Sequence, residues 1–146
     1  METYEWIKIE WPTLGYTVRG RLLADQNPEL TKKFLEQLPV ESMMGHVVIS
    51  GETMWFPTKI LHFGPNRMVK RAVGDIYFFA SGQSVCMTYG SITESAKVNK
   101  FGEVVAEDIP TLKKVGKEIL DRTVYQAHHE NVPVYVSKME SEASHE

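Results

Sequence analysis

The sequence predicts a mainly β fold, an antiparallel barrel or sandwich covered by two helices. The stretch Gly74–Gly90, GDIYFFASGQSVCMTYG, shows period-two alternation on both sides of a Ser81-Gly82-Gln83 turn, which is typical of a β-hairpin. Both faces of this hairpin carry large side chains, so we expect at least one arm to be buried on both sides, as in a barrel wall. Around it the chain offers about eight strands and two helices.

The other predicted strands follow the same period-two pattern. We expect them at residues 6–11, 16–24, 45–49, 53–57 and 101–106. A last strand is expected at Val132–Val136, where Pro133 favours an edge position because proline lacks a backbone N–H.

Two segments have the one-sided apolar periodicity of helices that pack on a sheet. The first begins at Asn27-Pro28, where an N-cap side chain precedes a proline, and stops at Pro39. The second runs from Asp108, the expected N-cap, to Asp121.

Length and composition predict one domain over residues 1–138 and a flexible tail at 139–146. A formal net charge of −3 gives no basic surface for nucleic acid, and no run approaches the roughly 20 apolar residues of a membrane span. The single cysteine and a charged N-terminus without a signal-peptide core favour a cytoplasmic protein. No phosphate loop, dinucleotide fingerprint or zinc signature occurs, so we expect no cofactor, no metal, and neither a nucleic-acid nor a membrane partner.

Three stretches resemble the cyclophilin-like superfamily. RGRLLADQNPELTKKFLEQLP, at residues 19–39, looks like the strand, turn and first helix of cyclophilins. FGEVVAEDIPTLKKVGKEI, at residues 101–119, resembles the strand that leads into their second helix, and Gly74–Gly90 is similar to the central strands of bacterial and archaeal cyclophilin-like proteins of unknown function. The resemblance implies a closed, antiparallel, eight-stranded cyclophilin-like β-barrel with a helix over each open end.

Prolyl isomerase activity does not carry over with this resemblance. Cyclophilins have a His-Arg pair on their third strand; here His46 matches the histidine, but Val47 stands where the arginine is expected. Glu52 and Trp55 fall near the two other positions of the proline pocket, which are Phe and Gln in cyclophilins. A peptide-binding module or weak prolyl isomerase is therefore an alternative function and not the leading one.

A histidine, a hydroxyl and a carboxylate follow one another at even spacing. His46, Ser50 and Glu52 would share one side of an ideal strand, where His46 and Glu52 could act as acid and base and Ser50 could bind a polar ligand. The alternative is that Ser50-Gly51-Glu52 is simply a turn, with Gly51 breaking the register.

Further residues are candidates for the wall of a small-molecule pocket. Tyr89, at a strand end, could hydrogen-bond a ligand. Trp55 or Phe56 could form an apolar wall, and Arg67 could receive a carboxylate, with a solvated loop charge as the alternative for Arg67. Tyr77 is expected in the core, and Cys86, placed mid-strand, is expected to be buried and unreactive.

The leading prediction is a protein that binds a small polar or anionic metabolite in a pocket on one barrel face. The residues leave open whether acid/base catalysis accompanies binding. A further alternative is a non-catalytic assembly subunit that pairs through an edge strand at Val132–Val136, and we expect a homo-oligomer.

Overall fold

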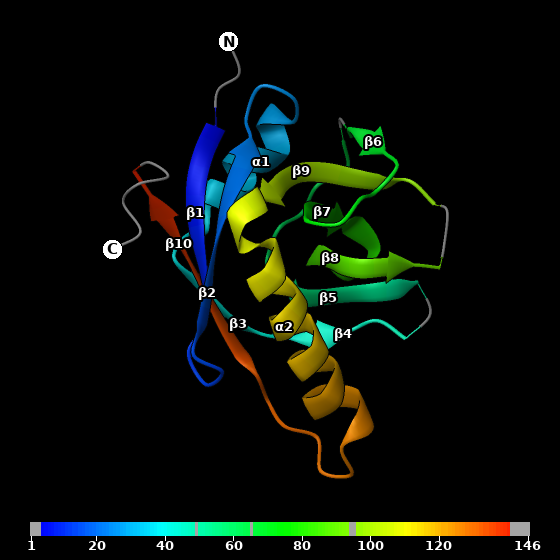
Figure 1. Ribbon diagram of the computed structural model, residues 1–146. Coiled ribbons are helices and arrows are strands. Elements are labelled where there is room, and N and C mark those ends of the chain that lie inside the picture. Colours follow the sequence, from blue (N-terminus) through cyan, green and yellow to red (C-terminus); the bar gives the residue numbers. More distant parts are fainter. Residues whose placement is uncertain (1–3, 49, 65, 94–95, 141–146) are drawn as a thin grey trace.

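The computed structural model describes residues 4–48, 50–64, 66–93 and 96–140, and shows one antiparallel sheet that curls almost into a barrel (Figure 1). The strands are β1 (Tyr4–Trp11), β2 (Tyr16–Leu23), β3 (Val40–Met43), β4 (Gly45–His46), β5 (Gly51–Pro57), β6 (Met68–Val69), β7 (Asp75–Phe79), β8 (Ser84–Ile92), β9 (Val98–Val104) and β10 (Pro133–Met139). The helices are α1 (Pro28–Glu36) and α2 (Ile109–Leu120), and α2 crosses the open face in front of the strands. Among the described residues, no helix is long and apolar enough to cross a membrane.

The predicted fold class is confirmed, with ten strands in the sheet where eight were predicted. The strand order is β3-β10-β1-β2-β9-β7-β8-β5-β4, and β6 pairs with β9 beside this path. The two additional strands are β3, which follows directly on the first helix, and the two-residue β6. β6 is too short to show a period-two pattern, and the sequence VESM of β3 does not alternate apolar with polar residues. The end strands β3 and β4 are consecutive in sequence, and the Ser42 hydroxyl of β3 donates to the Pro57 carbonyl oxygen of β5 (2.8 Å).

The prediction that the last strand lies at an edge is wrong. β10 is paired on both sides, because Tyr135 faces Glu10 of β1 and Glu41 of β3. Pro133 is the first residue of β10 and lies beyond the part that pairs with β1, so its missing N–H removes no hydrogen bond to that strand. The proposed assembly through an exposed Val132–Val136 edge therefore loses its basis.

Both helices begin where predicted, but neither has the expected side-chain cap. The Asn27 amide instead donates to Asn99 Oδ1 (2.8 Å) and to the Lys100 carbonyl oxygen (2.9 Å). The Asp108 carboxylate accepts hydrogen bonds from the Arg19 guanidinium (3.0 and 3.1 Å). In both cases the polar side chain ties the helix start to a neighbouring strand, and this tertiary contact replaces the local one.

The hairpin of β7 and β8 forms a wall that is buried on both faces, as predicted. One face belongs to the main core, with Ile76, Phe78, Val85 and Met87. On the other face Tyr77, Cys86 and Val98 form a second, smaller apolar cluster, against which Trp55 packs. The wall therefore separates the barrel interior from a second apolar environment outside it.

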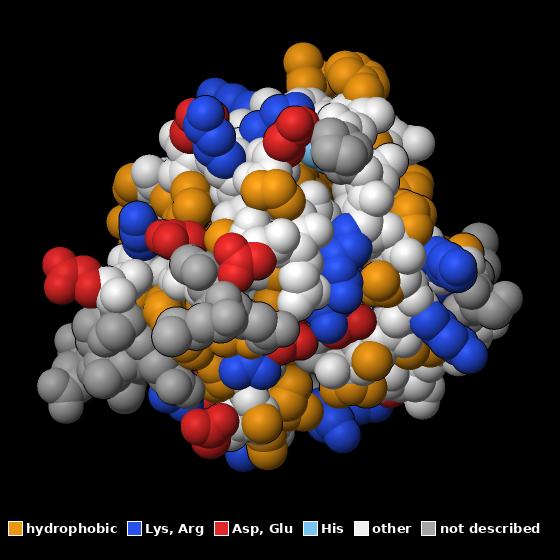
Figure 2. All heavy atoms as spheres, turned by 90° about the horizontal axis from the view of Figure 1, so that it is seen from above, with side chains coloured by type: hydrophobic (Ala, Val, Ile, Leu, Met, Phe, Trp, Pro, Cys, Tyr) orange, Lys and Arg blue, Asp and Glu red, His pale blue; other side chains and the backbone are white. Residues whose placement is uncertain are grey.

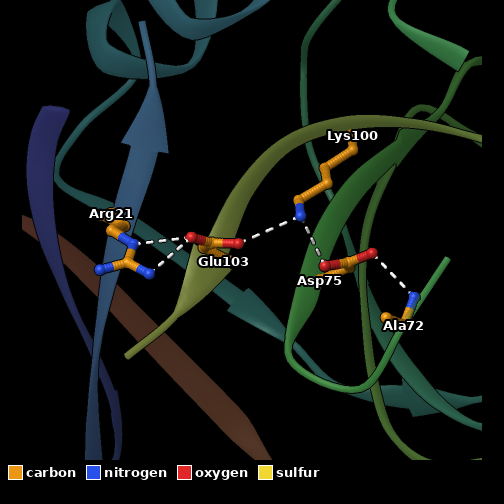
Figure 3. A network of polar contacts seen from close by, with 5 residues as sticks. All are labelled: Arg21, Ala72, Asp75, Lys100 and Glu103. Atoms are coloured by element: carbon orange, nitrogen blue, oxygen red, sulfur yellow. Dashed lines mark hydrogen bonds and ion pairs between the residues drawn. The ribbon is translucent and has the colours of Figure 1, made fainter. Parts of the chain in front are cut away.

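A chain of charged side chains crosses the outside of β2, β9 and β7 (Figure 3). Arg21 Nε donates to Glu103 Oε1 (2.7 Å), and Lys100 Nζ bridges Glu103 Oε2 (3.1 Å) and Asp75 Oδ1 (2.8 Å). Asp75 Oδ2 in turn accepts a hydrogen bond from the backbone N–H of Ala72 (2.8 Å). The network thereby fixes the turn that leads into β7.

Gly116 offers a test of how closely α2 packs on the sheet. A Cβ at this position would overlap the ring of Tyr89, which is buried against the helix. Alanine favours a helix over glycine by about 1 kcal/mol, whereas overpacking a rigid ring costs about 1–3 kcal/mol. We therefore expect Gly116→Ala to lower the free energy of unfolding by about 1 kcal/mol, as measured by urea denaturation. Lys114→Ala, on the exposed face of α2, is the control, and a Gly116→Ala protein as stable as wild type would contradict this packing.

Candidate functional site

A polar cluster lies where α2 meets the ends of β4, β5 and β8. Tyr89 of β8 is fully buried, and its hydroxyl lies 2.7 Å from Nε2 of the half-buried His46 on β4. The other ring nitrogen, Nδ1, contacts the Val47 carbonyl oxygen. A carbonyl oxygen only accepts, so Nδ1 carries the proton and, in the neutral ring, Nε2 accepts from the Tyr89 hydroxyl.

Burial governs the ionisation of this pair. It lowers the pKa of His46, an effect that the Val47 carbonyl oxygen and the Glu52 carboxylate only partly offset. Burial and the nearby Glu52 charge raise the pKa of Tyr89 well above its ordinary value. Both side chains are therefore neutral near pH 7, and the pair is a hydrogen bond between uncharged groups.

Glu52 completes the cluster as an ionised carboxylate at its surface. The Lys117 ammonium of α2 pairs with Oε2, and the Ser91 backbone N–H donates to Oε1 (2.8 Å). These two hydrogen bonds, that from Lys117 first, lower the pKa of Glu52. Because Lys117 is largely exposed, the pair contributes little to stability, but it ties α2 to β5 and β8.

A cavity of about 620 Å³ opens on the other side of the same wall. The described residues that line it are Val47, Val48, Ser50, Trp55, Arg71, Tyr77, Phe79, Gly82, Ser84, Cys86, Ala96, Lys97 and Val98. We call it the outer cavity. Its volume suits a small molecule, and among these residues two are cationic and none is acidic.

Arg71 and Tyr77 provide the buried polar groups of the outer cavity. Arg71 is 7% exposed, and its Nη1 donates to the Tyr77 hydroxyl (2.9 Å). Burial raises the pKa of Tyr77, so the phenol stays neutral beside the guanidinium. Cys86 is buried, as predicted, and burial raises the pKa of its thiol to about 12, which disfavours the reactive thiolate. The cavity thus offers a fixed positive charge and a phenol oxygen within apolar walls.

The predicted site residues fall into two groups on opposite faces of the wall. His46, Glu52 and Tyr89 come together under α2, whereas Ser50 and Trp55 line the outer cavity. Gly51 begins β5 with a φ of +121° that favours glycine, and the register with β8 shifts between Gly51 and Thr53. Gly51 therefore breaks the register, as the alternative interpretation expected, but Gly51 and Glu52 belong to a strand and not to a turn.

Two other predicted residues lie away from both groups. Phe56 is buried in the main core, because it alternates with Trp55 along β5. Arg67 lies before β6, where its backbone N–H donates to Asn99 Oδ1 (2.9 Å).

Sequence reasoning did not select Arg71, Lys97 or Lys117 for a site. The only available signal for Arg71 was its position just before the central hairpin.

No family model matches the sequence, and no curated protein does. Solved structures do match. The chain is similar to McbB, solved in complex with tryptophan, with a TM-score of 0.82 and 24% identity over 92% of this chain and 45% of that chain. It is also similar to the hypothetical protein AF2241 from Archaeoglobus fulgidus, with a TM-score of 0.62 and 16% identity over 95% of this chain and 98% of that chain. A third similar structure is the Mimivirus cyclophilin, with a TM-score of 0.54 and 13% identity over 92% of this chain and 87% of that chain.

These likenesses show the fold. The protein has a cyclophilin-like fold, as the resemblance of its sequence predicted, and spans less than half the length of the McbB chain. At 24% identity or less they do not assign a substrate or a reaction to this chain.

The lowered pKa of His46 predicts that acid destabilises the protein. The unfolded chain, in which His46 has its ordinary pKa of 6.5, binds the proton before the folded chain does. The stability contributed by neutral His46 is therefore fully present above pH 6.5 and is lost as the pH falls below it. The lowered pKa of Glu52 acts in a separate window, because that contribution is lost only as the pH falls below 4.5.

We expect the free energy of unfolding to fall between about pH 7.5 and pH 5 in wild type and to fall less in His46→Gln. Urea denaturation at a series of pH values measures this. His128→Gln, which removes an exposed histidine, is the matched control. If the free energy of unfolding of His46→Gln falls with pH in parallel with that of wild type, the loss of stability is not caused by protonation of His46.

Proposed function

We propose that this protein binds a small organic anion with a flat apolar part in the outer cavity. The observation that carries the proposal is the presence of Arg71 and Trp55 in one cavity whose described lining has no acidic side chain. A guanidinium binds carboxylates through paired hydrogen bonds, and an indole ring offers a flat apolar surface. The anionic group would meet Arg71, and Ser50 would lie along the same lining.

Exposed apolar side chains at the rim of the outer cavity favour a ligand with an apolar part. Phe79 and Val48 both line the cavity, yet they are 56% and 77% exposed. A bound molecule that covers them would remove apolar surface from water, which is favourable by about 25 cal/mol per Å². Lys97, also in the lining, adds positive charge to the entrance.

McbB adds support from the same fold. It was solved in complex with tryptophan, a molecule that joins an aromatic ring to a carboxylate. A ligand of this general chemistry would place its ring near Trp55 and Tyr77 and its carboxylate near Arg71.

Acid/base catalysis by Glu52 and His46 stays a prediction. Both residues lie on the α2 side of the wall and neither lines the outer cavity. Any catalysis in the cavity would therefore need other groups, such as the Tyr77 hydroxyl, which lies 2.9 Å from Arg71 Nη1. The alternative of a peptide-binding or prolyl isomerase module has less support, because apolar Val47 lines the cavity where the resemblance expects an arginine.

Binding can be tested with indole-3-acetate as the anionic probe and indole as its neutral counterpart, by titration calorimetry. We expect wild type to prefer indole-3-acetate. Arg71→Met should weaken the binding of indole-3-acetate by at least about tenfold, because a hydrogen bond to a charged group contributes about 2 kcal/mol. The same variant should leave the affinity for indole nearly unchanged. Trp55→Leu should weaken the binding of both probes.

Glu52→Gln is the matched control, because Glu52 lies across the wall from the cavity. An unchanged affinity for indole-3-acetate in Glu52→Gln would exclude Glu52 from binding and support the outer cavity. A loss in Glu52→Gln with none in Arg71→Met would instead place the ligand under α2 and refute the proposal.

A further inference from the structure

The segment after β5 exposes apolar side chains in a regular pattern. Ile60 and His62 are buried, each 2% exposed, whereas Leu61 and Phe63 are 61% and 90% exposed. We call residues 60–63 the apolar tip. In the view from above, apolar groups project at the upper edge of the surface (Figure 2). Single exposed apolar residues are common, but two that project from one anchored segment indicate a contact surface.

The backbone of the apolar tip is held in place by the body of the protein. Lys33 Nζ of α1 donates to the Leu61 carbonyl oxygen (2.8 Å), and Gln83 Nε2 donates to the Ile60 carbonyl oxygen (3.1 Å). The buried His62 ring packs edge-on against a core aromatic ring. The exposure of Leu61 and Phe63 is therefore built into the fold, and a binding partner would meet a preformed surface.

The stretch of sequence that contains the apolar tip is basic, although the whole chain has a formal net charge of −3. No acidic residue stands between Glu52 and Asp75 in the sequence. Lys59, beside the tip, and Lys70, beyond it, are both exposed. Lys33 of α1 also reaches the tip, and the same helix carries the exposed acidic residues Glu29 and Glu36. Charges within about 10 Å dominate the local potential at physiological salt, so an approaching surface meets apolar groups with Lys59 and Lys33 beside them.

We propose that the apolar tip docks on an anionic lipid surface, with Leu61 and Phe63 inserted at the head-group level and Lys59 and Lys70 against the phosphates. A few projecting apolar side chains combined with lysines are sufficient for reversible attachment to such a surface. The sequence had led us to expect no membrane partner, because it contains no membrane span. The present proposal is a contact with the surface of a bilayer and does not require a span.

The same observations disfavour two other occupants of the tip. A second copy of the chain would bring lysines against lysines in a two-fold contact, which is unfavourable. A specific protein partner needs about 800 Å² on each side, far more than two side chains provide. The proposal is independent of the outer cavity, because no tip residue is among its described lining.

Sedimentation of the full chain with vesicles tests the proposal. We expect binding to vesicles of phosphatidylcholine with about one third phosphatidylserine, little binding to phosphatidylcholine alone, and release as salt rises from about 0.05 to 0.5 M. The double variant Leu61→Ser/Phe63→Ser should bind at least about tenfold more weakly, since it removes the apolar surface that both side chains would bury at the head-group level. Lys59→Gln/Lys70→Gln should weaken binding and reduce its salt dependence.

Tyr125→Ser is the matched control, because Tyr125 is a 71% exposed aromatic residue that follows α2. It should bind vesicles as wild type does, and thermal melts should show that all variants fold. Failure of wild type to bind the anionic vesicles would overturn the proposal, as would unchanged binding by Leu61→Ser/Phe63→Ser. Binding to heparin but not to vesicles would also overturn it and would indicate an acidic macromolecule.

Discussion

The structure depends on a strand wall, β7-β8-β5, whose two faces are both buried. Strict alternation sends Met54 and Met87 into the main core and sends Trp55 and Cys86 to the opposite face. A shift of one residue in register would exchange the two sets and would place Arg71's partner Tyr77 in the barrel interior. The register that builds the core is thus the same constraint that builds the outer cavity.

The two faces hold their polar groups in different electrostatic surroundings. Under α2, Glu52 and Lys117 meet near water, where an ion pair is worth at most about 1 kcal/mol. Across the wall, Arg71 lies among apolar side chains, where water screens a charge less effectively. An anion that enters the outer cavity therefore gains more from Arg71 than a surface anion gains from Lys117. This difference in electrostatic surroundings is the reason why we propose the outer cavity, and not the cluster under α2, as the binding site.

Sequence reasoning predicted the parts of the fold that local pattern determines. The hairpin at Gly74–Gly90 and the apolar stripes of both helices follow from periodicity, and the structure confirms them. The edge position of β10 was predicted wrongly, because Pro133 lies at the first residue of a strand that is otherwise paired on both sides. Contacts between residues that are far apart in the sequence leave no periodic pattern from which they could be predicted. Arg71 lies next to the turn before β7, which Asp75 and Lys100, from two different strands, hold in place.

The two faces also share a physical connection at Val47 and Ser50. His46 contacts the Val47 carbonyl oxygen, and Thr93 donates its backbone N–H to the Ser50 carbonyl oxygen (3.2 Å). Val47 and Ser50 both line the outer cavity, so the polar cluster under α2 holds one wall of the cavity by its backbone. His46, Glu52 and Tyr89 are not among the described residues that line the cavity. The link between His46 and the cavity therefore runs through the backbone of Val47.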